Sequence, residues 1–207
     1  MTEIIIATKN KHKVSEMSEL LGGFADKICF KSLDDIGFDE EIAENGSTFE
    51  ENALIKARTV CKKTGKISLA DDSGLCVDAL LGEPGIYSAR YAAKDGKNSQ
   101  DDKNIEKLLE NLKHIPSGER TARFVCAIAL VLPDGREYTV KGISEGHITS
   151  ERRGSGGFGY DSVFFCPKFS KTFAQMTAEE KNAISHRNAA VKQIEKIIEE
   201  LIRREEI

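Results

Sequence analysis

Short apolar runs alternate with amphipathic segments along the first third of the chain. Residues 3–8 form a continuous apolar run typical of a strand covered on both faces, and residues 27–32 form a second candidate strand. Apolar positions at helical spacing predict a helix over residues 11–21, and the capping box Thr48-Phe49-Glu50-Glu51 predicts the start of another. This alternation of strands and helices is typical of an α/β domain.

A third predicted strand ends in two adjacent carboxylates. The apolar stretch 67–70 leads directly into Asp71 and Asp72, followed by Ser73 and Gly74. Carboxylates resist burial unless a cation or hydrogen-bond donors compensate them, and Mg²⁺ commonly sits on one or two carboxylates together with substrate phosphates. The alternative is a solvated corner between strand and loop, since Asp, Ser and Gly are common turn residues.

The rest of the chain predicts a hairpin and further helices. A turn at 82–85 and a polar loop at 93–100 precede an amphipathic helix over 101–113. Long strands at 121–132 and 137–148 flank Pro133-Asp134-Gly135, which predicts a β-hairpin. A short strand at 163–165, a capping box over 177–180 and a closing amphipathic helix follow. No repeat or linker separates independent domains, so residues 1–207 are predicted to form one domain.

Composition and charge limit the classes of protein to which this chain can belong. A hydrophobic fraction of 40% and a charged fraction of 31% are typical of a soluble globular domain. The net charge of −4, without a Lys/Arg block, argues against a nucleic-acid partner. Five scattered cysteines without a C-x-x-C pair indicate neither a zinc site nor a disulfide framework. Since no signal-peptide pattern or membrane-length apolar run is present, we expect a cytoplasmic protein in a reducing environment, with no membrane partner.

The polar turn between the first strand and the first helix is a candidate anion site. A helix start presents free backbone N–H groups and a positive dipole end, both of which favour phosphate. Thr8 and Asn10 add side-chain donors, and Lys13 adds a full charge. The turn lacks the glycines and the Gly-Lys-Ser/Thr ending of a P-loop. An ordinary turn with solvated lysines is the alternative.

Three further segments carry candidate chemistry. Glu44 precedes Gly46 in an acidic stretch, and Lys56 follows one helical turn after Asn52, so both are candidates to face Asp72 and a phosphate. The glycine-rich segment 155–161 surrounds an aromatic ring that offers a stacking platform for a flat ligand. Residues 180–187 bring several hydrogen-bond donors together near a helix boundary. Solvated loops, a core aromatic and a helix cap are the structural alternatives.

As a set, these segments resemble the inosine triphosphate pyrophosphatase family. The resemblance runs from Ile4 to about Ala190 and rests on six ordered blocks: Ala7-Thr8-Lys9-Asn10 with Lys13, Thr48-Phe49 with Glu51-Asn52-Ala53 and Lys56-Ala57, Ala70 to Leu75, Pro84 to Tyr91, Gly157 to Asp161, and Glu180-Lys181 with Ser185-His186-Arg187. Two positions depart from the family pattern, namely Lys9, where glycine is common, and Ser162, where proline is usual. Both departures affect loop stiffness rather than a chemical group.

The resemblance implies a fold, a reaction and a set of site residues. The implied fold is an elongated mixed β-sheet flanked by helices, with two lobes around a central active-site cleft, in a chain that forms a homodimer. The implied reaction is Mg²⁺-dependent hydrolysis of ITP, dITP and XTP to the monophosphate and pyrophosphate. Asp72 is implied as the catalytic residue, and Glu44 and Asp72 as metal ligands. Substrate binding is implied for Thr8, Lys9, Asn10, Lys11, His12, Lys13, Lys56, Ser73, Phe158, Gly159, Tyr160, Asp161, Lys181, His186 and Arg187.

These assignments are chemically consistent. Asp72 is placed to accept a proton from water that attacks the α-phosphorus, while Asp71 beside it raises the cost of ionising the pair unless a cation is bound. His186 and Arg187 can donate to a 6-oxo group, which adenine lacks, whereas guanine carries one and must be rejected elsewhere.

Three other functions stay open from the residues alone. A related pyrophosphatase acting on modified pyrimidines or ordinary nucleotides would use similar chemistry. A nucleotide-binding regulator without hydrolysis is disfavoured by the two acidic residues, Glu44 and Asp72, and a nucleic-acid-binding module is disfavoured by the charge.

Overall fold

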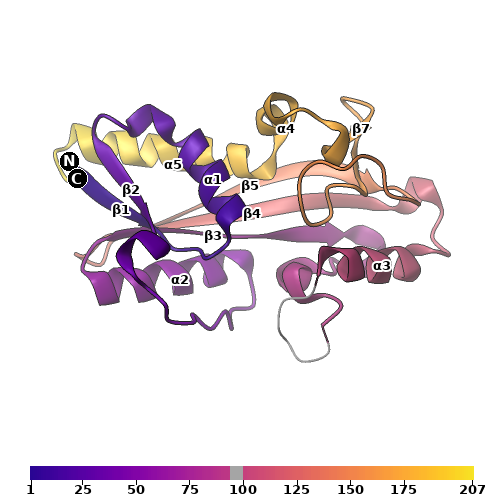
Figure 1. The fold of residues 1–207 in the computed structure, drawn as a ribbon, viewed down its shortest axis with the longest axis horizontal. Helices are drawn as coiled ribbons and strands as arrows, with labels where there is room; N and C mark the ends of the chain where they lie inside the picture. The colour runs from indigo at the N-terminus through magenta and orange to yellow at the C-terminus, as the bar shows by residue number, and fades with distance from the viewer. Residues whose placement is uncertain (94–99) are drawn as a thin grey trace. The chain divides into compact units, whose positions relative to one another are not determined.

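A computed structural model describes residues 1–93 and 100–207, which contain a mixed seven-stranded sheet flanked by helices (Figure 1). The strand order is β2-β1-β3-β4-β5-β6-β7, with β1 parallel to β2 and β3, and β6 antiparallel to β5 and β7. The strands are β1 (Thr2–Ile6), β2 (Ile28–Ser32), β3 (Ile67–Val77), β4 (Thr121–Val131), β5 (Glu137–Ile148), β6 (Phe164–Cys166) and β7 (Lys171–Thr172). The helices are α1 (Lys11–Leu20), α2 (Phe49–Thr64), α3 (Asp101–Leu112), α4 (Ala178–Ile184) and α5 (His186–Arg203). The predicted α/β class is therefore confirmed.

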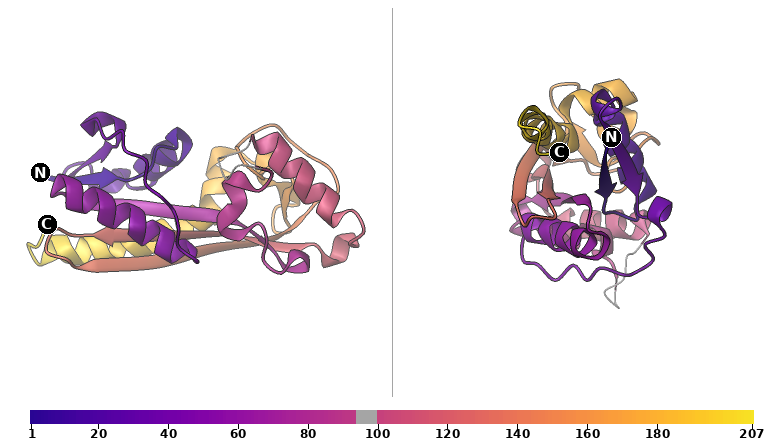
Figure 2. Two further views of the ribbon diagram at one scale, coloured as in Figure 1. Left: turned by 90° about the horizontal axis from the view of Figure 1, so that it is seen from below. Right: turned by 90° about the vertical axis from the view of Figure 1, so that its left-hand side faces the viewer.

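The chain divides into two compact units. Unit 1 comprises Met1–Asp72, Cys126–Gly142 and Arg187–Ile207, and unit 2 comprises Ser73–Val125 and Ile143–His186. Within unit 1, α1 and α5 cover one face of the strands and α2 covers the other (Figures 1 and 2). Because parallel strands are buried on both faces, this cover explains the continuous apolar run of β1.

The core of unit 1 joins the amphipathic faces of its helices to the sheet. Ile4 and Ile6 of β1 pack with Met17 of α1 and with Ile194 and Ile198 of α5, and all five are at most 1% exposed. The helical spacing that predicted α1 and α5 therefore identified the faces that are buried. This packing fixes α1 and α5 against β1, which pairs with β3, the strand that carries the two aspartates.

The core of unit 2 is rich in aromatic residues. Phe124 of β4 lies 4.6 Å from Phe164 and 5.7 Å from Phe173, ring centroid to centroid. Ile105 and Leu108 bring α3 into the same cluster. Such offset and tilted ring pairs add to the stabilisation from buried area alone.

Several predicted boundaries are confirmed within about two residues. The predicted hairpin is present, with the Leu132 N–H donating to the Arg136 carbonyl and Gly135 at φ +93°. The short strand β7 was not predicted, and the interior of the predicted polar loop at 93–100 lies outside the described residues. Within the described ranges, no helix combines the length and apolar character required to cross a membrane.

Two predictions at helix and strand ends need correction. β3 does not end at Asp71 and Asp72 but continues through them to Val77. The capping box over 177–180 is complete, whereas at α2 only half of the predicted box forms. Thr48 Oγ1 accepts from the Glu51 N–H, but the Glu51 carboxylate accepts from Ser47 N and Oγ instead of Thr48 N.

Candidate active site

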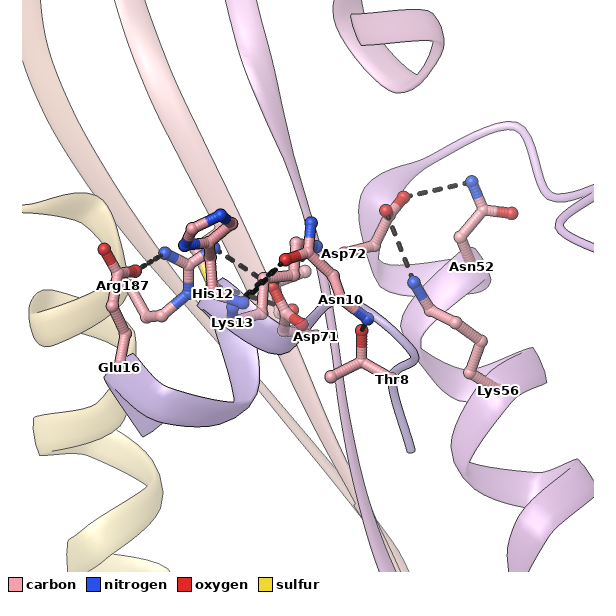
Figure 3. A network of polar contacts seen from close by, with 12 residues as sticks. Thr8, Asn10, His12, Lys13, Glu16, Asn52, Lys56, Asp71, Asp72 and Arg187 are labelled. Carbon is pink, nitrogen blue, oxygen red and sulfur yellow. Dashed lines mark hydrogen bonds and ion pairs between the residues drawn. The ribbon is translucent and has the colours of Figure 1, made fainter. Parts of the chain in front are cut away.

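The two adjacent aspartates on β3 point in opposite directions (Figure 3). Asp72 faces α2, where Asn52 and Lys56 contact it, and Asp71 faces Lys13 of α1. Successive side chains alternate between the faces of a strand, so continuation of β3 through the pair separates the two carboxylates. Each therefore belongs to a different network of charges, although both are buried, at 0% exposed for Asp71 and 7% for Asp72.

Asp72 shares one buried ammonium group with Glu44. Lys56 Nζ lies 3.5 Å from Asp72 Oδ1 and 3.3 Å from Glu44 Oε1. On its other oxygen, Asp72 accepts a 3.1 Å hydrogen bond from Asn52 Nδ2. Two carboxylates thus converge on one cation, as the sequence predicts for Glu44, Lys56 and Asp72.

Burial and charge shift the pKa values of this group. Burial raises the pKa of Asp72, and although Lys56 and Lys13 lower it, it stays above its usual range, with Glu44 adding repulsion. Burial lowers the pKa of Lys56, but the charges of Asp72 and Glu44 outweigh burial and raise this pKa above its usual range. The ammonium therefore stays charged. A carboxylate with a raised pKa next to fixed cations is suited to accept a proton.

Asp71 is the centre of an ion network on the other face. Its Oδ2 lies 2.9 Å from Lys13 Nζ and 3.4 Å from Arg187 Nη2, and Arg187 Nη1 also pairs with Glu16. Burial raises the pKa of Asp71, but Lys13 and Arg187 lower it far below its usual range. The cations Lys13 and Arg187 thus compensate Asp71, while burial and Glu44 raise the pKa of Asp72.

The polar turn before α1 is closed by its own side chains. Thr8 Oγ1 accepts from the Asn10 N–H at 3.2 Å, and Asn10 Oδ1 accepts from the His12 and Lys13 N–H groups at 3.0 and 3.3 Å. The sequence predicts free N–H groups here, whereas these three are bound. Lys9 Nζ donates to the Asp39 carbonyl at 2.6 Å, and Lys11 and His12 are exposed. A phosphate at this turn would replace the Thr8 and Asn10 oxygens as acceptors.

A second group of candidate residues lies in unit 2, around the glycine-rich loop. Asp161 Oδ2 accepts from the Phe158 N–H at 3.0 Å and from Lys181 Nζ at 2.8 Å. The same ammonium lies 4.9 Å from the centroid of the Phe158 ring, which is a favourable distance for a cation over an aromatic face. Asp161 therefore fixes both the loop backbone and the lysine beside its aromatic ring.

The remaining candidates of unit 2 are tied to its core. The His186 ring stacks on Phe124 at 4.8 Å, and the Tyr160 hydroxyl donates to the Ser88 carbonyl at 2.8 Å. Ser73 is half-buried at the start of the unit. A cavity of about 260 Å³ lies against the loop and is lined by Asp101, Asp102, Ile105, Arg152, residues 154–159, Asp161 and Ser162.

The sequence matches the model of the Ham1 family over residues 4–197. The chain belongs to the Ham1 family. Over 198 residues it is 52% identical to the dITP/XTP pyrophosphatase of Halalkalibacterium halodurans, covering 95% of this chain and 98% of that protein. It is 50% identical to the dITP/XTP pyrophosphatase of Bacillus subtilis, at 96% and 98% coverage. The structure of a HAM1 protein from Coxiella burnetii matches with a TM-score of 0.87 and 42% identity, covering 97% of this chain and all of that one.

Glu44 and Asp72 of this Ham1 family chain are the residues that could hold a Mg²⁺ ion. Glu44 and Asp72 offer carboxylate oxygens that already face one cation, the Lys56 ammonium. Among the described residues, no group of three or more His, Cys, Asp or Glu side chains is arranged to hold a metal alone. Mg²⁺ commonly binds one or two carboxylates and completes its shell with water and substrate phosphates, so two carboxylates suffice.

Some residues of the site have partners in the structure that differ from the predicted ones. Arg187 was grouped with His186 for base recognition, but the structure assigns Arg187 to unit 1, beside Asp71 and Glu16. Asn52 lies in a predicted candidate segment but has no predicted role, and Glu16 is absent from the predicted site. Helical spacing offered a signal for both, because Asn52 precedes Lys56 by four residues and Glu16 follows Lys13 by three.

Proposed function

We propose that this Ham1 family chain hydrolyses ITP, dITP and XTP to the nucleoside monophosphate and pyrophosphate, removing these nucleotides from the pool. The observation that carries the proposal is the buried Asp72 carboxylate, which shares the Lys56 ammonium with Glu44. The relatives with 50% and 52% identity are dITP/XTP pyrophosphatases, which supports the same kind of reaction and substrate. An acid–base group beside fixed cations is what hydrolysis of a phosphoanhydride requires.

In this reaction, water attacks the α-phosphorus and pyrophosphate leaves with the electrons of the broken anhydride bond. Asp72 accepts the proton of the attacking water, for which its raised pKa is suited. Lys56 and Lys13 balance the charge of the triphosphate oxygens and hold the departing group. Glu44 and Asp72 are the residues that would hold a Mg²⁺ ion, which would supply further charge neutralisation and Lewis acidity.

We assign recognition of the base to Lys181 and His186, with Phe158 as a stacking surface. Hypoxanthine and xanthine accept hydrogen bonds at the 6-oxo group, whereas adenine donates there and would leave the donors of the site without partners. A site of this kind discriminates between such bases by about 10⁴-fold. The Lys181 ammonium, fixed by Asp161 beside the Phe158 ring, supports this assignment.

The test is pyrophosphate release from ITP, dITP, XTP, dGTP and dATP, with Mg²⁺ and with excess EDTA. We expect release from the first three with Mg²⁺, little release from dATP, and none with EDTA. Equal turnover of dATP and dITP would contradict the proposed base selection, and turnover in EDTA would contradict the proposed metal requirement. Absence of release from all five nucleotides would overturn the proposed activity.

We also propose that the protein works as a homodimer, as the family resemblance implies. Size-exclusion chromatography with light scattering measures this directly. The chain mass is 22.8 kDa, so a dimer gives twice that mass. A single species at the chain mass, at all concentrations used for the assay, would contradict the dimer.

A further inference from the structure

Asn52 is a buried polar residue in the first turn of α2, and its amide must be compensated by hydrogen bonds. It is 0% exposed and lies four residues after the helix cap Thr48. Asparagine is a poor helix former, and a buried amide is destabilising unless both of its polar atoms are bonded. Both polar atoms of the amide form hydrogen bonds, and both partners lie outside α2.

The two bonds of the Asn52 amide lead to two different parts of unit 1. Its Oδ1 accepts from the backbone N–H of Gly46 at 2.9 Å, and its Nδ2 donates to Asp72 Oδ2 at 3.1 Å. The orientation of the amide is fixed, because a backbone N–H can only donate and an ionised carboxylate can only accept. A single side chain therefore links the loop of Glu44 to the strand of Asp72.

The loop lies so close to α2 that residue 46 must be small. A Cβ atom on Gly46 would lie 2.7 Å from Glu51 Cβ and 2.8 Å from Asn52 Oδ1. The glycine lets the backbone approach the amide, two residues after Glu44. The position of this loop thus depends on contact with Asn52.

A neighbouring side chain provides a natural comparison. The Glu51 carboxylate accepts from Ser47 N and Oγ at 2.6 and 2.7 Å, so it also ties the loop to α2. Glu51 is exposed, and it bonds to Ser47 of the loop and to the helix cap Thr48. Asn52 differs from it by its bond to Asp72.

We infer that Asn52 is a positioning residue, which sets the separation and orientation of Glu44 and Asp72 so that the pair binds a divalent cation. The inference rests on the proposed function, because it concerns the two carboxylates assigned there to Mg²⁺. Second-layer groups of this kind orient metal ligands without touching the ion. Asn52 acts by constraining its neighbours and does not contact the substrate.

The test measures binding of Mn²⁺ alone, by the electron paramagnetic resonance signal of free Mn²⁺, to the full chain without nucleotide. Asn52→Leu keeps the branched shape of the side chain and removes both bonds, so we expect the affinity to fall by about 10- to 100-fold. Gly46→Ala places a Cβ atom against both Glu51 and Asn52, leaves the Asn52 side chain in place, and should also weaken binding. Glu51→Ala is the matched control, with an expected affinity close to that of the wild type.

Each outcome supports or overturns the inference. Wild-type affinity in Asn52→Leu, an equal loss in Glu51→Ala, or no Mn²⁺ binding by the wild-type chain would overturn it. If Asn52→Leu fails to fold, as circular dichroism would show, the Mn²⁺ affinity of Gly46→Ala is compared with that of Glu51→Ala instead.

Kinetics give a second and independent measure. Asn52→Leu should raise the Mg²⁺ concentration that gives half-maximal pyrophosphate release and leave kcat at saturating Mg²⁺ much less affected. A fall in kcat alone would overturn the positioning role. Failure of the wild-type chain to hydrolyse dITP would instead remove the proposed function, and the Mn²⁺ comparison distinguishes the two failures.

Discussion

Asp71 and Asp72 have the same side chain, yet their environments give them opposite protonation behaviour. Lys13 and Arg187 surround Asp71 closely enough to outweigh its burial, whereas burial dominates at Asp72. For a carboxyl group, the direction of the pKa shift shows whether its ionised form favours folding. A carboxyl group with a lowered pKa stabilises the fold when ionised, and one with a raised pKa opposes folding when ionised.

Asp71→Asn is therefore expected to destabilise the protein. The variant leaves Lys13 and Arg187 near an uncharged partner, and loss of one member of a buried ion pair costs about 3–5 kcal/mol. At about 2–4 °C per kcal/mol, Tm should fall by roughly 10 °C at pH 7. Because the folded pKa is lowered, the difference from wild type should shrink as pH falls below about 4, where the unfolded carboxyl is protonated. A constant difference between pH 7 and pH 3 would contradict this account.

Asp72→Asn is expected to show the reverse pattern. The raised pKa means that ionised Asp72 opposes folding at neutral pH, so a neutral amide of the same size should leave Tm unchanged or higher. Pyrophosphate release from dITP should fall by about 10²- to 10⁴-fold, the usual contribution of a general base. Thermal unfolding and turnover measured on the same preparation check both parts. Substantial activity in this variant would remove Asp72 from catalysis.

At the scale of elements, the sequence predicted most helices and strands but not the course of β3. Asp, Ser and Gly favour turns, so local propensity predicted that the strand ends at residue 71. The strand continues because Lys13, Lys56 and Asn52 come from α1 and α2 to compensate the carboxylates. Tertiary partners override local propensity here, and a single sequence does not show which residues those partners are.

For the candidate site, too, a single sequence does not show which residues contact each other. Glu44, Lys56 and Asp72 come together in the structure, whereas the roles predicted from turn residues and glycines stay predictions. The sequence did not show that Thr8 and Asn10 serve as acceptors for the start of α1, because their hydroxyl and amide groups can act in either sense.

The glycine-rich loop supports a prediction at the scale of an element. Gly157 has φ +73°, and a Cβ there would lie 2.0 Å from Asp161 Oδ2, the atom that also binds Lys181. Gly159 has φ +57° but no neighbouring atom within 4 Å of its Cβ position. Gly157→Ala should therefore displace Asp161 and raise KM for dITP, whereas Gly159→Ala should change KM much less. Steady-state kinetics of the two variants check this, and equal effects would exclude Asp161 as the reason.

At the scale of the whole molecule, the division into units explains why the sequence contains no linker. The chain passes between the units after Asp72, Val125, Gly142 and His186. The first three points lie inside β3, β4 and β5, so the chain crosses between the units within strands rather than within loops. A change of composition, the usual signal of a domain boundary, is therefore absent, and the sequence predicts a single domain.

This connectivity predicts a single cooperative unfolding transition. Neither unit is one continuous segment, and three strands contribute residues to both, so loss of either unit removes parts of strands from the other. Differential scanning calorimetry should show one transition whose calorimetric and van't Hoff enthalpies agree. At about 0.7 kcal/mol per residue, the 207 residues should give an enthalpy of about 145 kcal/mol near 60 °C. Two resolved transitions, or a van't Hoff enthalpy near half the calorimetric value, would instead mean that the units unfold independently despite their shared strands.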